Sequence, residues 1–312
     1  MIKRTLYFGN PTYLSLRNEQ LVVKLPEVEG NDTLPESFKK ESVRTLAIED
    51  IGVMVLDHPQ ITLTHGLLDK LTQQNVALIT CGSNHLPTGL LLPLDGNTLQ
   101  QERYEYQVAA SLPLKKQLWQ QTIQSKIANQ AYVLHLLNGV EVGNMYAWSN
   151  TVKSGDADNL EARAAAYYWA NMFPNFPAFR RGQEEDYPNN LLNYGYAILR
   201  AIIARSLVAS GLLPTLGIHH HNRYNAYCLA DDIMEPYRPF VDKLVVDTMK
   251  KFPDILTLTK EIKASLLQVP VLDVVINNQR SPLMVATAQT TASLVKCFAG
   301  DLRKIAYPQW EN

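Results

Sequence analysis

Residues 216–239 gather the side chains best suited to metal chemistry in this chain of 312 residues. The stretch reads LGIHHHNRYNAYCLADDIMEPYRP, with the triplet His219–His221 followed closely by Asp231, Asp232 and Glu235. Asp232 and Glu235 are three residues apart, so on a helix they share one face, whereas Asp231 points elsewhere. Carboxylate oxygens are the ligands that Mg²⁺ and Mn²⁺ prefer, and an imidazole favours Mn²⁺. The stretch therefore predicts a site for a hard divalent metal.

A second interpretation of the same acids remains open. The helix dipole favours acidic residues at helix N-termini, and for Asp231 we prefer this interpretation. Glu161, in the separate stretch EARAAAYYW, fits a first-turn partner of the dipole and a functional residue equally well. Glu161, one histidine of the triplet and Glu235 therefore form a candidate ligand set that the fold must assemble from separate segments.

Helices are expected to position these candidate ligands. From residue 101 onward apolar residues recur at helical spacing, residues 161–169 are helix-prone, and residues 189–211 form a strongly apolar helix. The segments can bring the ligands together if these helices pack side by side. Pro236 is tolerated only near a helix start or a kink, so we expect Glu235 at such a point.

The first third of the chain has a different pattern. Short β-rich runs punctuated by Gly, Pro and Asn predict a small β domain with one helix at 64–74. The expected strands are 5–16, 19–25, 43–47, 52–56 and 76–80. The turn signal Asp95-Gly96 ends this pattern. We therefore expect an α+β chain, with an N-terminal β domain over residues 1–95 and a larger all-α catalytic domain over residues 96–312.

Composition and charge restrict the possible functions. The net charge is −1, with −3 in residues 1–100 and +2 in residues 101–312, so any DNA-binding surface must be a local patch. Three separated cysteines, an odd number, argue against a disulfide framework and favour a reducing cytosol. The sequence shows no apolar run of roughly 18 residues and no signal peptide, so we expect a cytoplasmic protein without a membrane span.

The motifs of this chain resemble those of a known family. GIHH and LADDIMEPYRP, preceded by EARAAAYYW, are similar to the motifs of the CRISPR-associated integrase of spacer acquisition, the CRISPR-associated protein 1 family. The resemblance covers essentially the whole chain, and the N-terminal MIKRTLYFGNPTYLSL is most similar to members from type II systems, with subtype C as the candidate. It implies an N-terminal β domain, a C-terminal helical domain and a metal-dependent DNA endonuclease and integrase.

The resemblance also assigns roles to individual residues. The glutamate of the family falls on Glu161, its final acid on Glu235, and its histidine on His220, which lies three residues after Gly217. These three residues are expected to be catalytic and to bind Mg²⁺ or Mn²⁺. Asp232 matches the adjacent acidic position and is expected to have an auxiliary role. His219 and His221, which flank His220, leave the choice of histidine open.

The implied reaction is a transesterification of DNA. A free 3′-hydroxyl attacks a phosphodiester at the border of a CRISPR repeat, and a metal ion polarises the phosphoryl oxygen and activates the hydroxyl. No protein nucleophile is needed. The arginines expected to position phosphates are Arg180, Arg181, Arg223 and Arg238.

The resemblance further implies partners. The expected substrates are double-stranded prespacer DNA with 3′ ends and CRISPR repeat DNA. Two homodimers are expected to flank a dimer of a small ferredoxin-like adaptation subunit, forming a heterohexamer, and a type II effector nuclease is a further candidate partner. Exposed edge strands of the N-terminal domain can pair with another chain, so we expect this domain to form part of the homodimer interface.

Two alternative functions remain open from the sequence. The chain could be a non-catalytic DNA-binding subunit in which the acidic cluster only shapes the fold. It could also be a metal-dependent phosphoesterase of small molecules, which would need a closed pocket and would act on nucleotides without DNA. Metal-dependent strand transfer separates both alternatives from the integrase.

Overall fold

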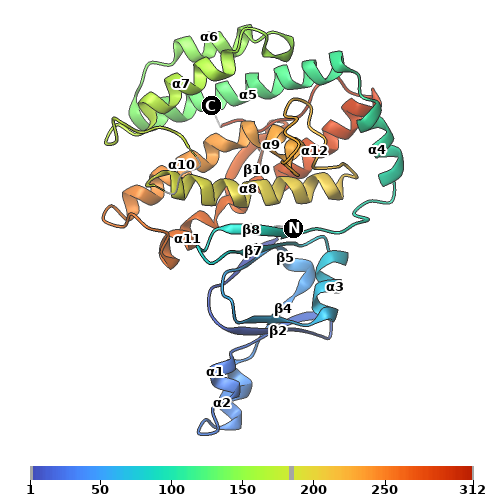
Figure 1. Ribbon diagram of the computed structural model, residues 1–312, viewed down its shortest axis with the longest axis vertical. Helices are drawn as coiled ribbons and strands as arrows, with labels where there is room; N and C mark the ends of the chain where they lie inside the picture. Colours follow the sequence, from blue (N-terminus) through green and yellow to red (C-terminus); the bar gives the residue numbers. More distant parts are fainter. Residues whose placement is uncertain (1–2, 183–185, 311–312) are drawn as a thin grey trace. The chain divides into compact units, whose positions relative to one another are not determined.

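The chain divides into two compact units, Met1–Gly96 and Asn97–Asn312. The computed structural model describes residues 3–182 and 186–310 of the chain. The first unit is built on β-sheets and the second on helices (Figure 1). The α+β class expected from the sequence is therefore confirmed.

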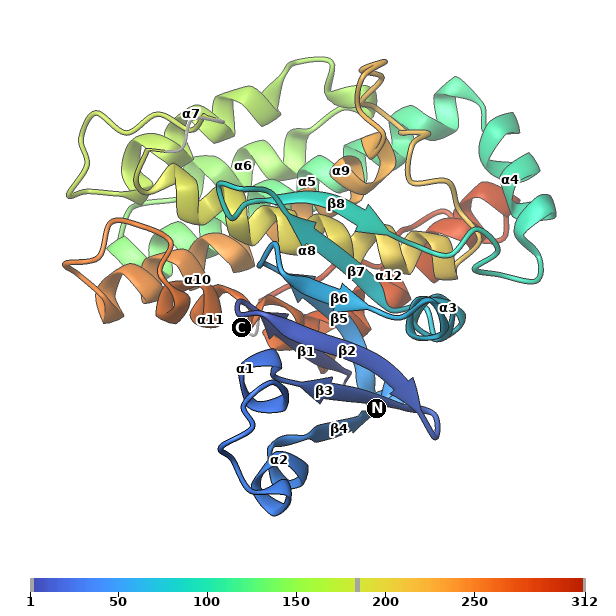
Figure 2. The ribbon, with the colours of Figure 1, turned by 60° about the horizontal axis from the view of Figure 1, so that its bottom comes forward.

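The N-terminal unit contains two four-stranded sheets. One has the strand order β1-β5-β7-β8 and the other the order β4-β3-β2-β6. The strands are β1 (Arg4–Phe8), β2 (Thr12–Arg17), β3 (Gln20–Lys24), β4 (Arg44–Ala47), β5 (Ile51–Leu56), β6 (Ile61–Leu63), β7 (Ala77–Cys81) and β8 (Pro87–Leu91). The helices are α1 (Pro26–Glu29), α2 (Glu36–Ser42), the 3₁₀ helix η1 (Ile48–Asp50) and α3 (His65–Gln73). Figure 2 shows β2, β3 and β4 following one another in the second sheet.

One hydrophobic cluster joins both sheets to α3. Every residue of β5 is buried, as expected for a strand covered on both faces, and this explains its unbroken apolar run IGVMVL. Leu14 of β2 packs in the same cluster as Leu67 and Leu71 of α3. The β2–β3 hairpin turns at Asn18 and Glu19, whose φ angles of 50° and 60° are those that a two-residue type I′ turn requires.

The N-terminal unit differs in detail from the sequence prediction. The run expected as one strand at 5–16 forms two strands, β1 and β2, which belong to different sheets. Gly9-Asn10-Pro11 separates them, because proline has no N–H to continue a ladder. The short strands β6 and β8 were not expected, since three to five residues give too little alternation to be recognised.

The C-terminal unit is mostly helical. Its helices are α4 (Gln100–Ala109), α5 (Leu112–Asn138), α6 (Gly143–Thr151), η2 (Ser154–Asp156), α7 (Leu160–Met172), α8 (Asn189–Ala209), α9 (Cys228–Met234), η3 (Glu235–Tyr237), α10 (Arg238–Lys251), α11 (Lys260–Leu266), η4 (Val269–Val271) and α12 (Leu283–Ala299). A hairpin of β9 (Asp273–Ile276) and β10 (Gln279–Pro282) corrects the expectation of an all-α domain. Its tight turn at Asn277 and Asn278, both with positive φ, is another two-residue turn between short strands.

Helix α8 is the core helix of this unit. It is long and apolar enough to match a membrane span, which the search for apolar runs in the sequence did not anticipate. However, 78% of its most apolar window is buried in the structure. The segment α9–η3–α10 lies between α5 and α8, and α7 packs on α5 (Figure 1). The segments that carry Glu161, the histidines and Glu235 are therefore neighbours in space.

Candidate functional site

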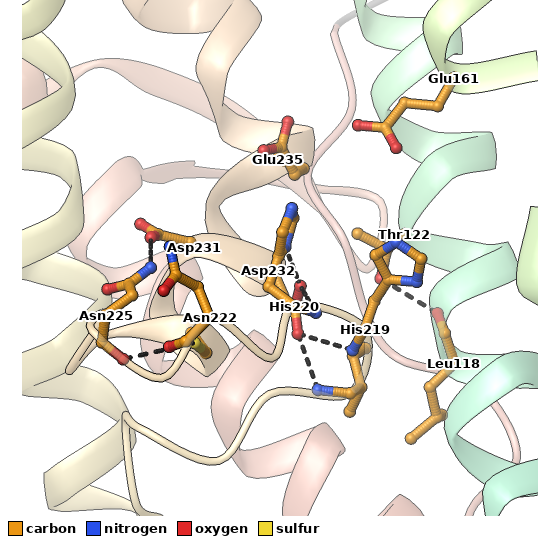
Figure 3. A network of polar contacts seen from close by, with 12 residues as sticks. Leu118, Thr122, Glu161, His219, His220, Asn222, Asn225, Asp231, Asp232 and Glu235 are labelled. Carbon is orange, nitrogen blue, oxygen red and sulfur yellow. Dashed lines mark hydrogen bonds and ion pairs between the residues drawn. The ribbon is translucent and has the colours of Figure 1, made fainter. Parts of the chain in front are cut away.

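Glu161 lies in the first turn of α7, and Asp156 fixes that turn. The two carboxylate oxygens of Asp156 accept the backbone N–H groups of Leu160 and Glu161, each at 2.9 Å. These N–H groups have no partner within the helix, so the Asp156 carboxylate caps the helix and complements its dipole. Glu161 points from α7 toward Glu235, and its side chain is 25% exposed (Figure 3).

The loop that carries the histidines wraps around the buried carboxylate of Asp232. Oδ2 of Asp232 accepts the N–H groups of Ile218 at 2.7 Å and His219 at 2.9 Å, and Oδ1 accepts that of His220 at 3.2 Å. Gly217 permits this approach, because a Cβ there would lie 2.8 Å from Asp232 Oδ2 and 2.4 Å from the His220 carbonyl oxygen. Asp232 therefore sets the path of the loop.

The same carboxylate orients the ring of His220. Nδ1 of His220 lies 2.5 Å from Oδ1 of Asp232, and the far edge of the ring faces Glu235 (Figure 3). The hydrogen bond to Asp232 is the main cause that raises the pKa of His220 above its usual value. In the neutral ring, Nδ1 donates this bond and Nε2 keeps a free lone pair toward Glu235.

The other two histidines have different surroundings. His219 stacks flat on Trp119, with ring centroids 4.1 Å apart and planes 2° from parallel. Burial lowers the pKa of His219, so this ring favours its neutral form. His221 is exposed. Of the triplet, His220 is the ring whose Nδ1 a carboxylate holds in place, an arrangement that is common for metal-ligating histidines.

Glu235 lies at a junction of helices. Helix α9 ends at Met234, the single 3₁₀ turn η3 contains Pro236, and α10 begins at Arg238. Glu235 therefore lies at a break between helices, as Pro236 predicted. The Glu235 side chain is only 4% exposed, and its Oε1 lies 3.0 Å from Nη2 of Arg238. Burial alone would raise the pKa of Glu235, but Arg238 and Lys126 outweigh burial and lower it, so the carboxylate is ionised.

Lys126 is the member of the site that sequence reasoning missed. Its Nζ lies 2.7 Å from Oε1 of Glu161 and 2.6 Å from Oε2 of Glu235, so it joins the two candidate ligands. Burial favours the neutral amine, but the two carboxylates outweigh it and raise the pKa of Lys126. Lys126 lies seven residues after Trp119 on the buried face of α5. The sequence did contain a signal for Lys126, because it falls in an apolar helical stripe and a buried lysine needs an acidic partner.

The residues fit a divalent cation by their chemistry. Two carboxylates and an imidazole are a reasonable set for Mg²⁺ or Mn²⁺, and the two carboxylates already converge on one positive charge. Oε2 of Glu235 is buried and, apart from its ion pair with Lys126, accepts no hydrogen bond from the described residues. Within residues 3–182 and 186–310, however, no three acidic, histidine or cysteine side chains are close enough to hold a metal as they stand. The Lys126 ammonium lies between the two carboxylates instead.

The four arginines expected to position phosphates fall into two groups. Arg238 pairs with Glu235 and lies over the Tyr196 ring, 4.9 Å from its centroid. Arg181 contacts α8: its guanidinium lies 5.1 Å from the centroid of the same Tyr196 ring and donates to Asn189 and Asn193. These two arginines are held by internal contacts.

The remaining two arginines are less constrained. Arg223 is exposed in the loop between the histidines and α9, with its guanidinium 4.7 Å from the centroid of Tyr224. Tyr224 is 81% exposed. The backbone carbonyl of Arg180 accepts a hydrogen bond from Asn189, and Arg180 is exposed. Arg180 and Arg223 therefore have the accessibility that a phosphate contact needs.

Asp231 has a structural environment. Its Oδ1 accepts from Nε of Arg200 at 2.7 Å, and its Oδ2 accepts from Asn225 at 2.7 Å. Arg200 belongs to α8, so this acid ties the loop and α9 to the core helix. The structure thus separates Asp231 from Glu161, His220 and Glu235, in line with the interpretation preferred from the sequence (Figure 3).

Comparisons with known proteins place the whole arrangement in one family. The family model for CRISPR associated protein Cas1 matches residues 6–252. A CRISPR-associated endonuclease Cas1 from Neisseria meningitidis is 34% identical over 269 residues, covering 86% of this chain and 83% of that protein. A casposase bound to its integration product has a TM-score of 0.75 at 17% identity, covering 98% of this chain and 92% of that one. A Cas6-RT-Cas1–Cas2 complex has a TM-score of 0.72 at 17% identity, covering 97% of this chain and 36% of that one. Likeness at these identities establishes the fold, while the family model and the Neisseria relative establish the family: this chain belongs to the Cas1 family of CRISPR-associated proteins.

Proposed function

We propose that this protein is a metal-dependent DNA endonuclease and integrase that inserts short DNA fragments into a CRISPR array. Its relatives are CRISPR-associated endonucleases, and a structural neighbour is a casposase bound to an integration product. The observation that carries the proposal is the convergence of Glu161 and Glu235 on one cation position beside an anchored imidazole. That arrangement is typical of sites that bind hard divalent metals rather than of nucleophilic enzymes.

The reaction proposed is a transesterification at phosphorus. The 3′-oxygen of the incoming fragment forms a bond to the phosphorus of the target strand, and the bond from that phosphorus to the target 3′-oxygen breaks. The attacking hydroxyl loses a proton and the leaving oxygen gains one, so the number of phosphodiester bonds is unchanged. A bound Mg²⁺ or Mn²⁺ supplies polarisation of the phosphoryl oxygen and activation of the hydroxyl.

Each residue of the chain has a defined task in this proposal. Glu161 and Glu235 present carboxylate oxygens, and His220 presents Nε2, as the ligands of the divalent cation. Asp232 holds Nδ1 of His220 and so fixes the ring and its tautomer. Arg238 balances the charge of Glu235 from the opposite side of the carboxylate. Arg180 and Arg223 are the accessible residues for DNA phosphates.

The partners follow from the family and its neighbours. The casposase neighbour is bound to an integration product and another neighbour is a complex with Cas2, which supports DNA and a Cas2 subunit as partners of this chain. We further propose a homodimer that joins the small adaptation subunit in a heterohexamer, in a type II system and in the cytoplasm. Light scattering at micromolar concentration tests the dimer, and a mass of about 35 kDa in a protein that still integrates both ends contradicts it.

Strand transfer by the purified protein with its Cas2 partner tests the function. A supercoiled plasmid bearing one CRISPR repeat and a labelled duplex with free 3′ ends are combined with Mg²⁺, with Mn²⁺ or with EDTA. We expect labelled, relaxed plasmid only with metal. Tight DNA binding without joining would instead indicate a non-catalytic subunit, and hydrolysis of nucleotides without DNA would indicate a phosphoesterase.

A further inference from the structure

Lys126 occupies the position that a shared metal ion would need. Its Nζ is within 2.7 Å of one oxygen of Glu161 and one oxygen of Glu235, and its side chain is 9% exposed. The two carboxylates come from different helices, α7 and the η3 turn, and Lys126 comes from a third, α5. A single ammonium therefore holds together two acids that the sequence places far apart.

The charges of this cluster balance without a metal. Glu161 and Glu235 carry two negative charges, while Lys126 and Arg238 carry two positive charges. A divalent cation added beside Lys126 would face an ammonium at close range, and like charges a few ångströms apart repel strongly in a partly buried site. A metal shared by the two carboxylates thus requires the ammonium to leave its position.

We propose that Lys126 is a tethered counter-ion that positions Glu161 and Glu235 in the metal-free protein and is displaced when a divalent cation binds. This inference rests on the metal site of the proposed function. Lys126 is a positioning residue, because it acts through the two carboxylates. Metal binding and the Lys126 ion pairs then compete for the same oxygens, and the apparent metal affinity is lower than the bare ligands would give.

The geometry allows this exchange. A lysine ammonium sits on a flexible stem of four carbons, so Nζ can move several ångströms while α5 stays in place. Glu161 is the more exposed of the two acids, at 25% against 4% for Glu235, so the site is open to solvent on the α7 side. Arg238 is held by Glu235 and by the Tyr196 ring, and remains as the fixed positive charge of the cluster.

Lysine labelling of the wild-type protein tests the displacement directly. The protein is treated briefly with an acylating reagent in EDTA and in saturating Mn²⁺, and modification at each lysine is measured by mass spectrometry. We expect Lys126 to be protected in EDTA and several-fold more reactive in Mn²⁺. Lys243, which pairs with Asp247 on the surface of α10, is the internal control and keeps its reactivity. Continued protection of Lys126 in saturating Mn²⁺ overturns the proposal.

Binding calorimetry with Mn²⁺ alone tests the competition. Lys126→Met removes the competing charge, and we expect it to bind Mn²⁺ at least about tenfold more tightly than wild type while melting at a lower temperature in EDTA. Lys126→Arg keeps the positive charge and is the matched variant, which can also be measured if the Met variant does not fold. We expect it to bind Mn²⁺ no more tightly than wild type. Equal Mn²⁺ affinity in wild type and Lys126→Met overturns the competition but leaves the metal site standing. Absence of Mn²⁺ binding in every variant overturns the metal site itself.

Discussion

Two buried carboxylates on the same continuous segment, Glu235 and Asp242, have opposite electrostatic environments. Glu235 faces two cations, Lys126 and Arg238, which lower its pKa despite burial. Asp242, on α10, accepts hydrogen bonds from the hydroxyls of Tyr168 at 2.9 Å and Tyr196 at 2.5 Å. There, burial is the largest effect and raises the pKa of Asp242 to about 6.

The comparison distinguishes an ionised carboxylate paired with cations, Glu235, from a carboxylate in a structural hydrogen-bond network, Asp242. A carboxylate paired with cations, as Glu235 is with Lys126 and Arg238, stays ionised. In our proposal it exchanges the lysine ammonium for a metal ion. Asp242 accepts its hydrogen bonds from neutral hydroxyls, those of Tyr168 on α7 and Tyr196 on α8, and these bonds tie both helices to α10. Tyr196 connects the two regions, because Arg238 stacks on its ring and its hydroxyl donates to Asp242. We therefore expect substitutions in the two regions to affect different measurements.

The largest effect is expected at Glu161. Glu161→Gln keeps the size of the side chain but removes a charged ligand from the proposed metal site. If this ligand stabilises the transition state by about 4 kcal/mol, its loss lowers the rate of strand transfer about 10³-fold. Initial rates of plasmid strand transfer measure the loss, and a melting temperature close to wild type shows that the fold is intact. Undiminished integration would remove Glu161 from the site.

The histidine triplet should show a ranked effect. His220→Ala is expected to lower strand transfer roughly 10²-fold, about 3 kcal/mol, because it removes the ring that Asp232 anchors. His219→Ala loses the stacking on Trp119 and an edge contact with the His220 ring, and His221→Ala loses an exposed ring. Neither change removes the bond between His220 and Asp232, so each variant should stay within a few-fold of wild type. The same three proteins are compared in one assay. A larger loss for His219→Ala would transfer the ligand role to that ring.

A smaller effect is expected at the accessible arginines. Replacing Arg180 or Arg223 by Ala should weaken DNA binding and reduce the slope of log affinity against log salt by about one each, as expected for one lost phosphate contact. Arg181→Ala removes bonds to Asn189 and Asn193 and should lower the melting temperature instead. Binding titrations at several salt concentrations separate the two outcomes. Unchanged slopes for Arg180 and Arg223 would move the DNA track to another surface.

The smallest effect on activity is expected at Asp242, where pH-dependent stability is the informative measurement. The folded-state pKa of about 6 lies above the usual value of 3.8, so the folded protein binds this proton more tightly. Protonated Asp242 therefore contributes roughly 3 kcal/mol to the free energy of unfolding. This contribution is fully present below about pH 4 and is lost as the pH rises through about 6. Asp242→Asn should abolish this loss, so its stability relative to wild type rises from pH 4 to pH 7. Parallel denaturation curves for the two proteins across that range would contradict the assignment.

The sequence points to the candidate ligands more readily than to the residues that surround them. The histidine triplet and Glu235 stand out as a dense cluster beside Gly217 and Pro236, and Pro236 correctly places Glu235 at a break between helices. Glu161 fits a helix-dipole partner equally well and was given its role only by the resemblance to the family. The β-hairpin at 273–282 was missed because strands of four residues carry no clear period. Lys126 was missed for a different reason: its place in the apolar stripe of α5 signals a buried lysine, but the identity of its partners depends on α5 packing against α7 and η3.

The arginines show the same limit. In the sequence, Arg180 and Arg181 are adjacent and equivalent, and either could contact a phosphate. Only the packed structure shows that Arg181 donates to α8 and lies over Tyr196, while the Arg180 side chain has no such ties among the contacts that the structure describes. Tertiary contacts of this kind depend on which helix faces which, and therefore require the fold.

A strand-transfer assay that compares Glu235→Gln with Asp242→Asn tests the central claim most directly. Both changes neutralise one buried carboxylate on the same segment, and both retain the size of the side chain. In Mg²⁺ or Mn²⁺ we expect Glu235→Gln to fall about 10³-fold below wild type, for the reason given for Glu161, while Asp242→Asn stays within about twofold. Equal activity of the two variants would contradict the claim that Glu161, His220 and Glu235 hold the catalytic metal ion.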